Sequence, residues 1–228
     1  MDRDQAKQRV ANAAVDLLPQ HGVIGLGTGS TATLFIDAVA ELVRRGRKLV
    51  GVPTSEASRR QAERLGIPLL DDVGPWTIDV CVDGADEVSE RLDLIKGGGG
   101  AHTREKIVNR AAKKNVIVVD ESKLSRRLGE KWRVPVEVLA FGRLATRQRL
   151  EEIGAVTERL KDGAPWITDS GNYIYDLAAG VIEDPAALET RIGLIPGVVE
   201  SGLFVGRADV VLVAGAAGVR TLARNGTG

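Results

Sequence analysis

Four consecutive glycines at positions 97–100 constrain the fold of this chain more than any other feature of its sequence. Glycine loses more conformational freedom on folding than any other residue, so such a run persists where the backbone adopts positive φ angles or approaches a ligand closely. Lys96 precedes the run, and residues 103–106 after it are typical of the start of a helix. The loop thus combines backbone N–H groups, an ammonium and a carboxylate. That set suits a small anionic substrate on which a proton is moved.

Length and charge narrow the class of protein. The chain has 228 residues and 43% hydrophobic content, enough for one large domain or a main domain with a smaller insert. Its 31 basic and 31 acidic residues balance, which disfavours nucleic acid or an anionic membrane as a partner. The N-terminus lacks the apolar core of a signal peptide, and no apolar run approaches membrane-spanning length. We therefore expect a soluble, cytoplasmic globular protein.

An anion site is predicted near the N-terminus. Residues 23–26 form a short apolar strand that leads through Gly27-Thr-Gly-Ser-Thr31 into a helical pattern. The N–H groups of such a turn and the positive end of the helix converge, and Thr28, Ser30 and Thr31 add hydroxyls. The turn also fits the loose dinucleotide pattern G-x-G-x-x-A, but the second strand ends at residues 52–55 without an acidic residue for a ribose. A single phosphate is favoured, and a dinucleotide is the alternative.

Strands and helices alternate through the first half of the chain. This rhythm predicts a Rossmann-like α/β domain, in which a parallel sheet carries helices on both faces. The expected helix after the glycines has Ile107, Val108 and Ala111 as its apolar face. The expected strands cover residues 23–26, 48–52, 67–70, 78–82 and 116–119, and the other helices lie near residues 6–17, 34–42 and 55–65.

The pattern changes at about residue 128. Short strands, tight turns at 162–163 and 170–171, and two helices indicate a smaller α+β domain with an antiparallel, ferredoxin-like sheet. The apolar run 208–214 is typical of a parallel strand buried on both faces, so we expect it to return to the first sheet. We therefore predict an α/β catalytic domain of residues 1–127 plus 206–228 and an inserted α+β domain of residues 128–205. Residues 225–228 are expected to fray.

Ionisable residues follow several of the expected strands, where open parallel sheets bind their ligands. Asp83 and Asp86 follow one strand, Lys96 and Glu105 flank the glycine run, and Lys123 follows a later strand. Each alone could be a solvated loop residue or a helix cap. Together they can serve a sugar phosphate: a carboxylate removes the proton α to the carbonyl, and an ammonium stabilises the oxyanion. An aldose–ketose isomerisation requires no more than this.

Metal binding is the rival use of paired carboxylates. Cys81 lies inside an apolar run and is expected as a buried strand residue, and His102 is the one imidazole near the glycines, so a zinc-type site lacks ligands. Magnesium bridging to a phosphate stays open. His21 and His102 are expected in loops or at the surface. We favour metal-free acid–base chemistry.

The residues resemble those of a known family, ribose-5-phosphate isomerase of type A. The resemblance covers essentially the whole chain, because several motifs occur in order at the family's spacing. These motifs occupy residues 25–31, 82–87, 95–101, 104–106, 119–123, 134–138 and 195–199. The resemblance implies interconversion of D-ribose 5-phosphate and D-ribulose 5-phosphate through an enediolate in the pentose phosphate pathway, with no metal or organic cofactor. It also implies a homodimer or homotetramer.

The resemblance also implies residue roles. Glu105 corresponds to the general base, Lys96 stabilises the enediolate, and Asp83 and Asp86 help to open the furanose ring and hold hydroxyls. The phosphate is expected at the turn of residues 28–31. The substrate-binding positions implied are Thr28, Gly29, Ser30, Thr31, Asp83, Gly84, Ala85, Asp86, Lys96, Gly97, Gly98, Gly99, Lys123 and Lys7.

Two other functions are compatible with parts of this sequence. A sugar-phosphate sensor that binds without turnover would share the α/β domain, but the chain begins almost directly with that domain and leaves no room for an N-terminal helix-turn-helix. A dehydrogenase would bind a nicotinamide cofactor at the Gly27 turn. Neither is favoured over the isomerase.

Overall fold

The computed structural model describes residues 3–224, so the expected frayed tail lies outside the described residues. The chain forms two compact units. The first, unit 1, comprises Met1–Ala85, Arg104–Lys123 and Arg207–Gly228, and the second, unit 2, comprises Asp86–Thr103 and Leu124–Gly206. The glycine run therefore lies in unit 2. The domain boundaries expected near residues 127 and 206 stay a prediction.

Unit 1 contains a six-stranded sheet in the order β15-β14-β6-β3-β1-β2. Five neighbouring strands are parallel, and β15 is antiparallel to β14. The strands are β1 (His21–Leu26), β2 (Lys48–Pro53), β3 (Val80–Asp83), β6 (Asn115–Asp120), β14 (Val210–Gly215) and β15 (Gly218–Ala223). The expected parallel sheet is confirmed, including the return of the late apolar run as β14.

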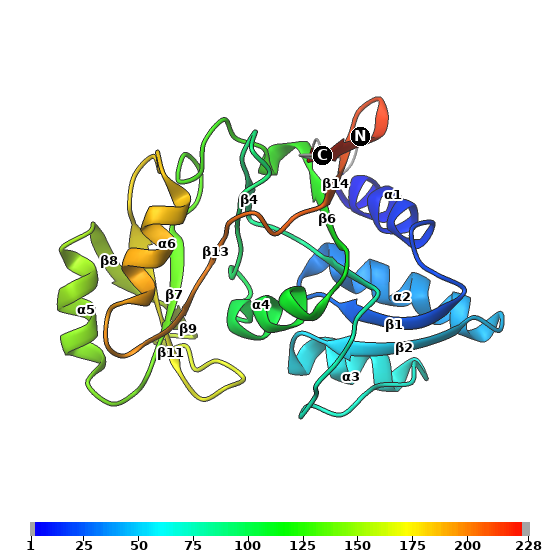
Figure 1. The fold of residues 1–228 in the computed structure, drawn as a ribbon, viewed down its shortest axis with the longest axis horizontal. Coiled ribbons are helices and arrows are strands. Elements are labelled where there is room, and N and C mark those ends of the chain that lie inside the picture. The colour runs from blue at the N-terminus through cyan, green and yellow to red at the C-terminus, as the bar shows by residue number, and fades with distance from the viewer. Residues whose placement is uncertain (1–2, 225–228) are drawn as a thin grey trace. The chain divides into compact units, whose positions relative to one another are not determined.

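Helices cover both faces of this sheet: α1 and α2 pack on one face, and α4 packs on the other. Figure 1 shows α2 beside β1. Alternate strand residues such as Leu26 and Val82 pack against Phe35 of α2 on one face. Cys81, from the intervening position, packs against Val108 of α4 on the other, and its expected burial is confirmed. The helices are α1 (Arg3–Val15), α2 (Ser30–Arg44), α3 (Glu56–Arg64) and α4 (His102–Ala111), and a short 3₁₀ helix, η1, covers Glu121–Lys123.

Two local expectations for unit 1 were wrong, and one strand was missed. Residues 67–70 form no strand and contribute a single bridge from Leu69 to Gly51. The edge strand β15 was not expected at all. Ile107 was expected on the buried face of its helix, but it is 54% exposed. The buried face instead carries Glu105, Val108 and Asn109, whose spacing of three to four residues places them on one side of α4.

Unit 2 is built on a four-stranded antiparallel sheet in the order β12-β7-β11-β8. Alternate β7 residues, such as Val136, pack with Leu150 of α5 and Ile192 of α6, so both helices cover the same face. In Figure 1 these two helices lie beside β7 and β8. The elements are β7 (Val134–Val138), β8 (Ala155–Glu158), β11 (Tyr173–Ala178), β12 (Val198–Ser201), α5 (Arg143–Glu151) and α6 (Pro185–Gly193). The expected α+β architecture is confirmed.

Two smaller sheets complete unit 2. One contains β4 (Glu87–Val88), β5 (Leu94–Ile95) and β13 (Leu203–Phe204), and the other is the hairpin of β9 (Leu160–Lys161) and β10 (Ala164–Pro165). The chain over residues 198–204 is divided at Gly202 into β12 and β13, which belong to different sheets. A Cβ at Gly202 would lie 2.2 Å from the carbonyl oxygen of Lys96, so this crossing point requires glycine. Residues 166–168 contribute one isolated bridge, from Ile167 to Tyr173.

No helix within residues 3–224 is long and apolar enough to span a membrane.

Asp79, just before β3, links two neighbouring segments of unit 1. Its Oδ1 accepts a hydrogen bond of 2.8 Å from Lys113 Nζ, and its Oδ2 accepts one of 3.0 Å from the N–H of Val23. The Lys113 ammonium first, and the Val23 N–H second, hold the pKa of Asp79 below its ordinary value of 3.8. Its charge therefore stabilises the fold fully above pH 3.8, and this contribution is lost as the pH falls through the lowered pKa.

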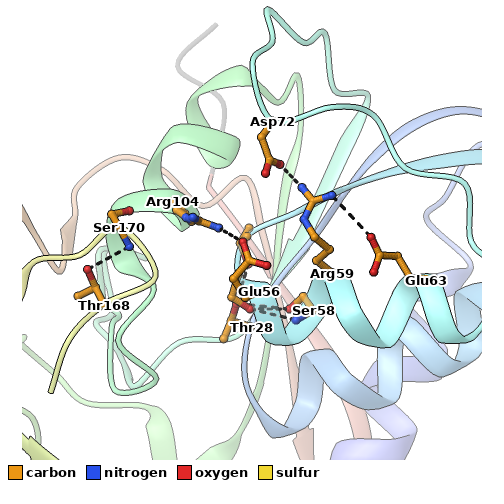
Figure 2. A network of polar contacts seen from close by, with 11 residues as sticks. Thr28, Glu56, Ser58, Arg59, Glu63, Asp72, Arg104, Thr168 and Ser170 are labelled. Atoms are coloured by element: carbon orange, nitrogen blue, oxygen red, sulfur yellow. Dashed lines mark hydrogen bonds and ion pairs between the residues drawn. The ribbon is translucent and has the colours of Figure 1, made fainter.

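We expect Asp79→Asn to lower the free energy of unfolding by about 0.5–1 kcal/mol at pH 7, the value for a partly exposed charged contact. The difference from the parent protein should shrink below pH 3.8. Urea unfolding at a series of pH values between 7 and 2.5 measures it. Asp72→Asn, at an exposed pair with Arg59 (Figure 2), is the matched control and should cost less. A difference that stays constant down to pH 2.5 would contradict the assignment.

Candidate active site

The carboxylate of Asp83 connects two turns of unit 1. Asp83 ends β3 and is 3% exposed, and its Oδ1 accepts hydrogen bonds from the N–H groups of Thr28 (3.0 Å) and Gly84 (2.7 Å). A Cβ at Gly27 would lie 2.3 Å from that oxygen, so no other residue fits at this position. The turn after β1 and the turn after β3 are thereby fixed to each other. The N–H of Thr28 was expected to face a phosphate, but it donates its hydrogen bond to Asp83 instead.

A hydroxyl network holds the Gly27 turn from its other side. Thr28 Oγ1 lies 2.7 Å from Thr54 Oγ1 and 2.9 Å from Ser55 Oγ. Ser58 Oγ, drawn with Thr28 in Figure 2, donates to the carbonyl of Gly27 at 2.6 Å. The sequence interpretation missed Thr54, Ser55 and Ser58. They could have been predicted from the sequence. Because β1 and β2 are neighbouring parallel strands, the residues that follow β2 lie at the same edge of the sheet as the residues that follow β1.

The N-terminus of α2 carries the polar residues expected to bind phosphate. Its N-cap is Gly29, at a φ of 107°, and no side chain there forms a capping hydrogen bond. Ser30 is exposed and Thr31 is half-buried. The helix is 15 residues long, so its first turn carries a full positive dipole end. This terminus therefore has the electrostatic character that an anion requires.

The two other expected phosphate contacts are cationic side chains of unit 1. Lys7 lies on α1, 18% exposed at its side chain, with Nζ 3.4 Å from Asp4 Oδ1. Lys123 ends η1 and is half-buried. Both side chains carry their charge at the end of a long aliphatic stem.

Glu105 lies in the first turn of α4 and is 4% exposed. Its neighbour Arg104 donates a hydrogen bond of 2.8 Å to Oε1 of Glu56 on α3, as Figure 2 shows. This guanidinium contact holds the pKa of Glu56 below its ordinary value. The Arg104–Glu56 pair thus ties the first turn of α4, and with it the backbone of Glu105, to α3.

Lys96 is almost fully buried in unit 2. It is 3% exposed, and its Nζ lies 5.4 Å from the centroid of the Phe204 ring, within cation–π range. Its N–H donates to the carbonyl of Gly202 at 2.9 Å, which continues the pairing of β5 with β13. The strand pairing therefore determines where the ammonium lies.

The glycine run packs tightly against its surroundings in unit 2. The N–H of Gly98 donates to Asp86 Oδ2 at 2.7 Å, and a Cβ at Gly98 would lie 2.7 Å from Asp86 Oδ1. Gly97 and Gly100 have φ angles of 108° and 75°. A Cβ at Gly100 would lie 3.0 Å from the ring of Trp166. Close approach and positive φ angles therefore both require glycine here.

His102 was expected at the surface, and this expectation was wrong. The residue is fully buried, and its Nε2 lies 3.3 Å from the carbonyl oxygen of Glu200. A Cβ at Gly97 would come within 2.7 Å of its ring. The absent side chain of Gly97 leaves the space that the imidazole fills. His21, by contrast, is exposed as expected.

Glu137 of β7 is a buried carboxylate that the sequence interpretation missed. It is 1% exposed and points to the helix-free face of the four-stranded sheet. Its oxygens accept hydrogen bonds from Thr103 Oγ1 (2.6 Å), Thr168 Oγ1 (2.9 Å) and Asn172 Nδ2 (2.8 Å). Thr168 also accepts from the N–H of Ser170, as Figure 2 shows. Three neutral donors thus surround this charge, one of them at the start of α4.

Arg159 is a further residue that the sequence interpretation missed. It follows β8 and donates from Nε and Nη2, two nitrogens on one edge of its guanidinium, to the carboxylate of Asp176. Its Nη1 donates to the carbonyl of Gly97. No sequence signal distinguished it, because its partners are 17 and 62 residues away along the chain.

The structure brings together some of the expected site residues within each unit. In unit 1 Asp83 contacts Thr28 and Gly84 directly. In unit 2 Asp86 contacts Gly98. Within residues 3–224, no group of three or more His, Cys, Asp and Glu side chains is arranged to hold a metal ion.

Comparison with known proteins identifies relatives over the whole chain. The sequence model of a family described as ribose 5-phosphate isomerase A (phosphoriboisomerase A) matches residues 50–218. Ribose-5-phosphate isomerase A of Gloeobacter violaceus is 49% identical over 224 residues, 97% of each chain. The protein of the same name from Thermomicrobium roseum is 44% identical over 230 residues, 100% of this chain and 97% of its own.

Solved structures agree with this likeness. Ribose 5-phosphate isomerase A from Methanocaldococcus jannaschii has a TM-score of 0.93 at 44% identity and covers 97% of this chain and 100% of its own. A D-ribose-5-phosphate isomerase in complex with phospho-erythronic acid has a TM-score of 0.95 at 39% identity, covering 98% of this chain and 100% of its own. The chain belongs to the ribose 5-phosphate isomerase A family.

Proposed function

We propose that this chain interconverts D-ribose 5-phosphate and D-ribulose 5-phosphate through an enediolate, with Glu105 as the general base. The observation that carries the proposal is the buried carboxylate of Glu105 in the first turn of α4, in a chain whose relatives are ribose-5-phosphate isomerases over nearly their full length. The enzyme is an aldose–ketose isomerase, and its reaction belongs to the non-oxidative branch of the pentose phosphate pathway.

The proton transfer can be written with this residue alone. The carboxylate of Glu105 takes the proton from C2 of the open-chain aldose, and the electron pair moves through C1 to O1, giving the enediolate. Glu105 then returns the proton to C1, and the hydroxyl proton passes from O2 to O1, which leaves a ketone at C2. The reverse reaction uses the same steps in the opposite order.

Lys96 stabilises the oxyanion of the enediolate in this proposal. Its ammonium is compact and buried, so little reorganisation is needed when the negative charge develops. Asp83 and Asp86 hold substrate hydroxyls and assist opening of the furanose ring. Each carboxylate is itself fixed by backbone N–H groups, Asp83 by Thr28 and Gly84 and Asp86 by Gly98.

The phosphate is bound at the N-terminus of α2 in this proposal, where no side chain caps the helix. Ser30 and Thr31 supply hydroxyls and helix N–H groups, and Lys7 and Lys123 supply charge. Gly29, Gly84, Ala85, Gly97, Gly98 and Gly99 line the substrate through their backbones, and Thr28 acts through its contact with Asp83. The reaction needs neither a metal ion nor an organic cofactor, because protein groups supply both the base and the counter-charge.

Proton NMR of the EDTA-treated protein with ribose 5-phosphate in D2O tests this function. We expect ribulose 5-phosphate to form, with solvent deuterium entering at the exchanged carbon. Binding that protects the protein against heat without turnover would support the sensor instead, and saturable nicotinamide binding would support the dehydrogenase. Neither alternative is favoured by relatives that are named as isomerases.

In the same assay we expect Glu105→Gln to lower kcat by about 10²- to 10⁴-fold, the usual contribution of a positioned general base, with KM little changed. Glu63→Gln, at an exposed glutamate of α3, is the matched control and should keep parental kcat. Near-normal turnover in Glu105→Gln would remove that residue from the mechanism.

We expect Lys96→Ala to lower kcat, because the ammonium interacts more strongly with the enediolate than with the substrate. Steady-state kinetics of the folded variant, verified by circular dichroism, measure it. Lys48→Ala, an exposed lysine of β2, controls for loss of a positive charge. An effect on KM alone would reduce Lys96 to a binding residue.

We also propose that the enzyme is a homo-oligomer, at least a dimer. Large apolar side chains are exposed on two segments of unit 2, residues 139–144 and 194–199. The N–H of Leu139 donates to the carbonyl of Gly197, so the two segments are adjacent. The exposed residues are Leu139 (47%), Phe141 (93%), Leu144 (62%), Leu194 (78%) and Val199 (37%). Apolar residues gathered in this way are typical of an interface, and a second copy of the chain is the occupant proposed.

We expect the parent protein to sediment as a dimer or tetramer and Phe141→Glu to sediment as a smaller species at the same concentration. Val73→Glu, at a 90% exposed apolar residue of unit 1, is the control and should leave the mass unchanged. Analytical ultracentrifugation measures both. A parent protein that stays monomeric at micromolar concentration would contradict the proposal.

We place the activity in the cytoplasm, where sugar phosphates are made and consumed, with neither nucleic acid nor membrane as a partner. The balance of 31 basic and 31 acidic residues supports this. Recovery of the activity in the membrane fraction of a cell extract would contradict it.

A further inference from the structure

Arg159 and Asp176 form a fixed ion pair on the helix-free face of the unit 2 sheet. Arg159 Nε donates to Asp176 Oδ2 at 2.9 Å, and Nη2 donates to Asp176 Oδ1. The two side chains are 11% and 21% exposed. Two parallel hydrogen bonds fix the plane of a guanidinium as well as its position, which a single contact cannot do. The third nitrogen, Nη1, is therefore aimed in a fixed direction.

That third nitrogen is aimed at the glycine run. Arg159 Nη1 donates to the carbonyl of Gly97 and lies 3.4 Å from the carbonyl oxygen of Gly98. The carbonyl of Gly97 also accepts the N–H of Gly100 at 2.9 Å. On the other side of the same peptide bond, the N–H of Gly98 donates to Asp86. A planar trans peptide directs its carbonyl and its N–H in opposite directions, so this one peptide is held at both ends by opposite charges.

Holding this peptide from outside matters because glycine has no side chain that restricts its own backbone conformation. Fixing the backbone of a residue costs roughly 1–2 kcal/mol of conformational entropy, and glycine is at the high end. A lysine in place of Arg159 would offer one ammonium and no planar fork, so it could not hold Asp176 and the loop together. The glycine loop begins directly after Lys96, so its conformation also determines the direction of the backbone on the C-terminal side of Lys96.

Trp166 holds the far end of the same loop. A Cβ at Gly100 would lie 3.0 Å from its ring. The backbone N–H of Trp166 donates to the carbonyl of Arg159 at 2.8 Å, and the Arg159 guanidinium lies 5.9 Å from the Trp166 ring centroid. The hairpin of β9 and β10 connects the two residues and brings them to one place. Gly97 and Gly100 are thus restrained by neighbours on a single connecting segment.

We propose that Arg159 is a positioning residue for the isomerisation: held by Asp176, it fixes the Gly97 and Gly98 carbonyls and so keeps Asp86 and the loop after Lys96 in the geometry that the enediolate requires. The inference rests on the proposed isomerase function. It assigns to Arg159 an effect on turnover through the loop, without contact with the reacting atoms.

Variants at this position are expected to fold. Arg159 borders a cavity of about 340 Å³ whose other lining residues are Gly98, Lys131, Trp132, Arg133 and Asp176. Because that lining is mostly charged and polar, a shorter side chain at position 159 can be hydrated there and leaves no dry void.

We expect Arg159→Gln and Arg159→Lys to lower kcat by about 10- to 100-fold, the cost of a small misplacement of catalytic groups, while KM changes less than about threefold. Asp176→Asn should act in the same direction. Arg143→Gln is the matched control in the same unit, because Arg143 also pairs with a carboxylate, Glu158, and lies 4.7 Å from the ring centroid of Tyr173. Its kcat should stay within about twofold of the parent. Guanidinium ion, below denaturing concentration, should restore part of the turnover of Arg159→Ala.

A second measurement does not depend on activity. Amide hydrogen exchange of the substrate-free protein should be faster in the peptide containing residues 97–100 in Arg159→Gln than in the parent, and unchanged there in Arg143→Gln. Parental kcat, or parental exchange in that peptide, in Arg159→Gln would overturn the proposal. So would an equal loss of turnover in Arg143→Gln, which would indicate general destabilisation. An inactive parent protein with the expected exchange pattern would instead count against the isomerase function and leave the loop restraint standing.

Discussion

The contact on which unit 1 most depends is the close approach of the Asp83 carboxylate to the backbone at Gly27. A carboxylate that is 3% exposed requires donors in place of water, and the N–H groups of Thr28 and Gly84 provide them. The approach is possible because β1 and β3 are adjacent parallel strands and because Gly27 has no side chain. Two turns at one sheet edge are thus fixed by one charge. The same turn leads into α2, so the position of the proposed phosphate site follows from this contact.

In unit 2, too, side chains approach the backbone closely at glycines, here beside an antiparallel sheet. Its helices bury one face, and the other face presents polar side chains such as Glu137 and Asp176. The glycine run packs there because each residue that lacks a side chain admits a neighbour: a carboxylate at Gly98 and an imidazole at Gly97. A loop of low intrinsic order becomes ordered through charged and aromatic groups supplied by residues distant in the chain. The chemistry proposed for Lys96 depends on the glycine loop being ordered by these distant residues.

Local patterns predicted the architecture, and long-range contacts account for what was missed. Apolar runs and helical periodicity record burial residue by residue, so the parallel sheet and the antiparallel insert could both be predicted. The break at Gly202 and the burial of His102 could not, since each depends on a segment that packs there only after folding. The contact of Arg159 with the glycine loop could not be predicted for the same reason, because its partner is distant along the chain. The roles of Glu105 and Lys96 were inferred from chemical type and family resemblance, and they stay predictions.

The contact between Trp166 and Gly100 has a spectroscopic consequence. The Trp166 indole lies near two cationic side chains, Arg159 and Lys161, so it experiences an electric field set by those charges. The wavelength of its fluorescence emission depends on that field. The chain has three tryptophans, so selective replacement of the other two, Trp76 and Trp132, would leave a single fluorophore at the loop. Trp166 fluorescence would therefore report directly on the conformation of the glycine loop, which the proposed chemistry requires to be ordered.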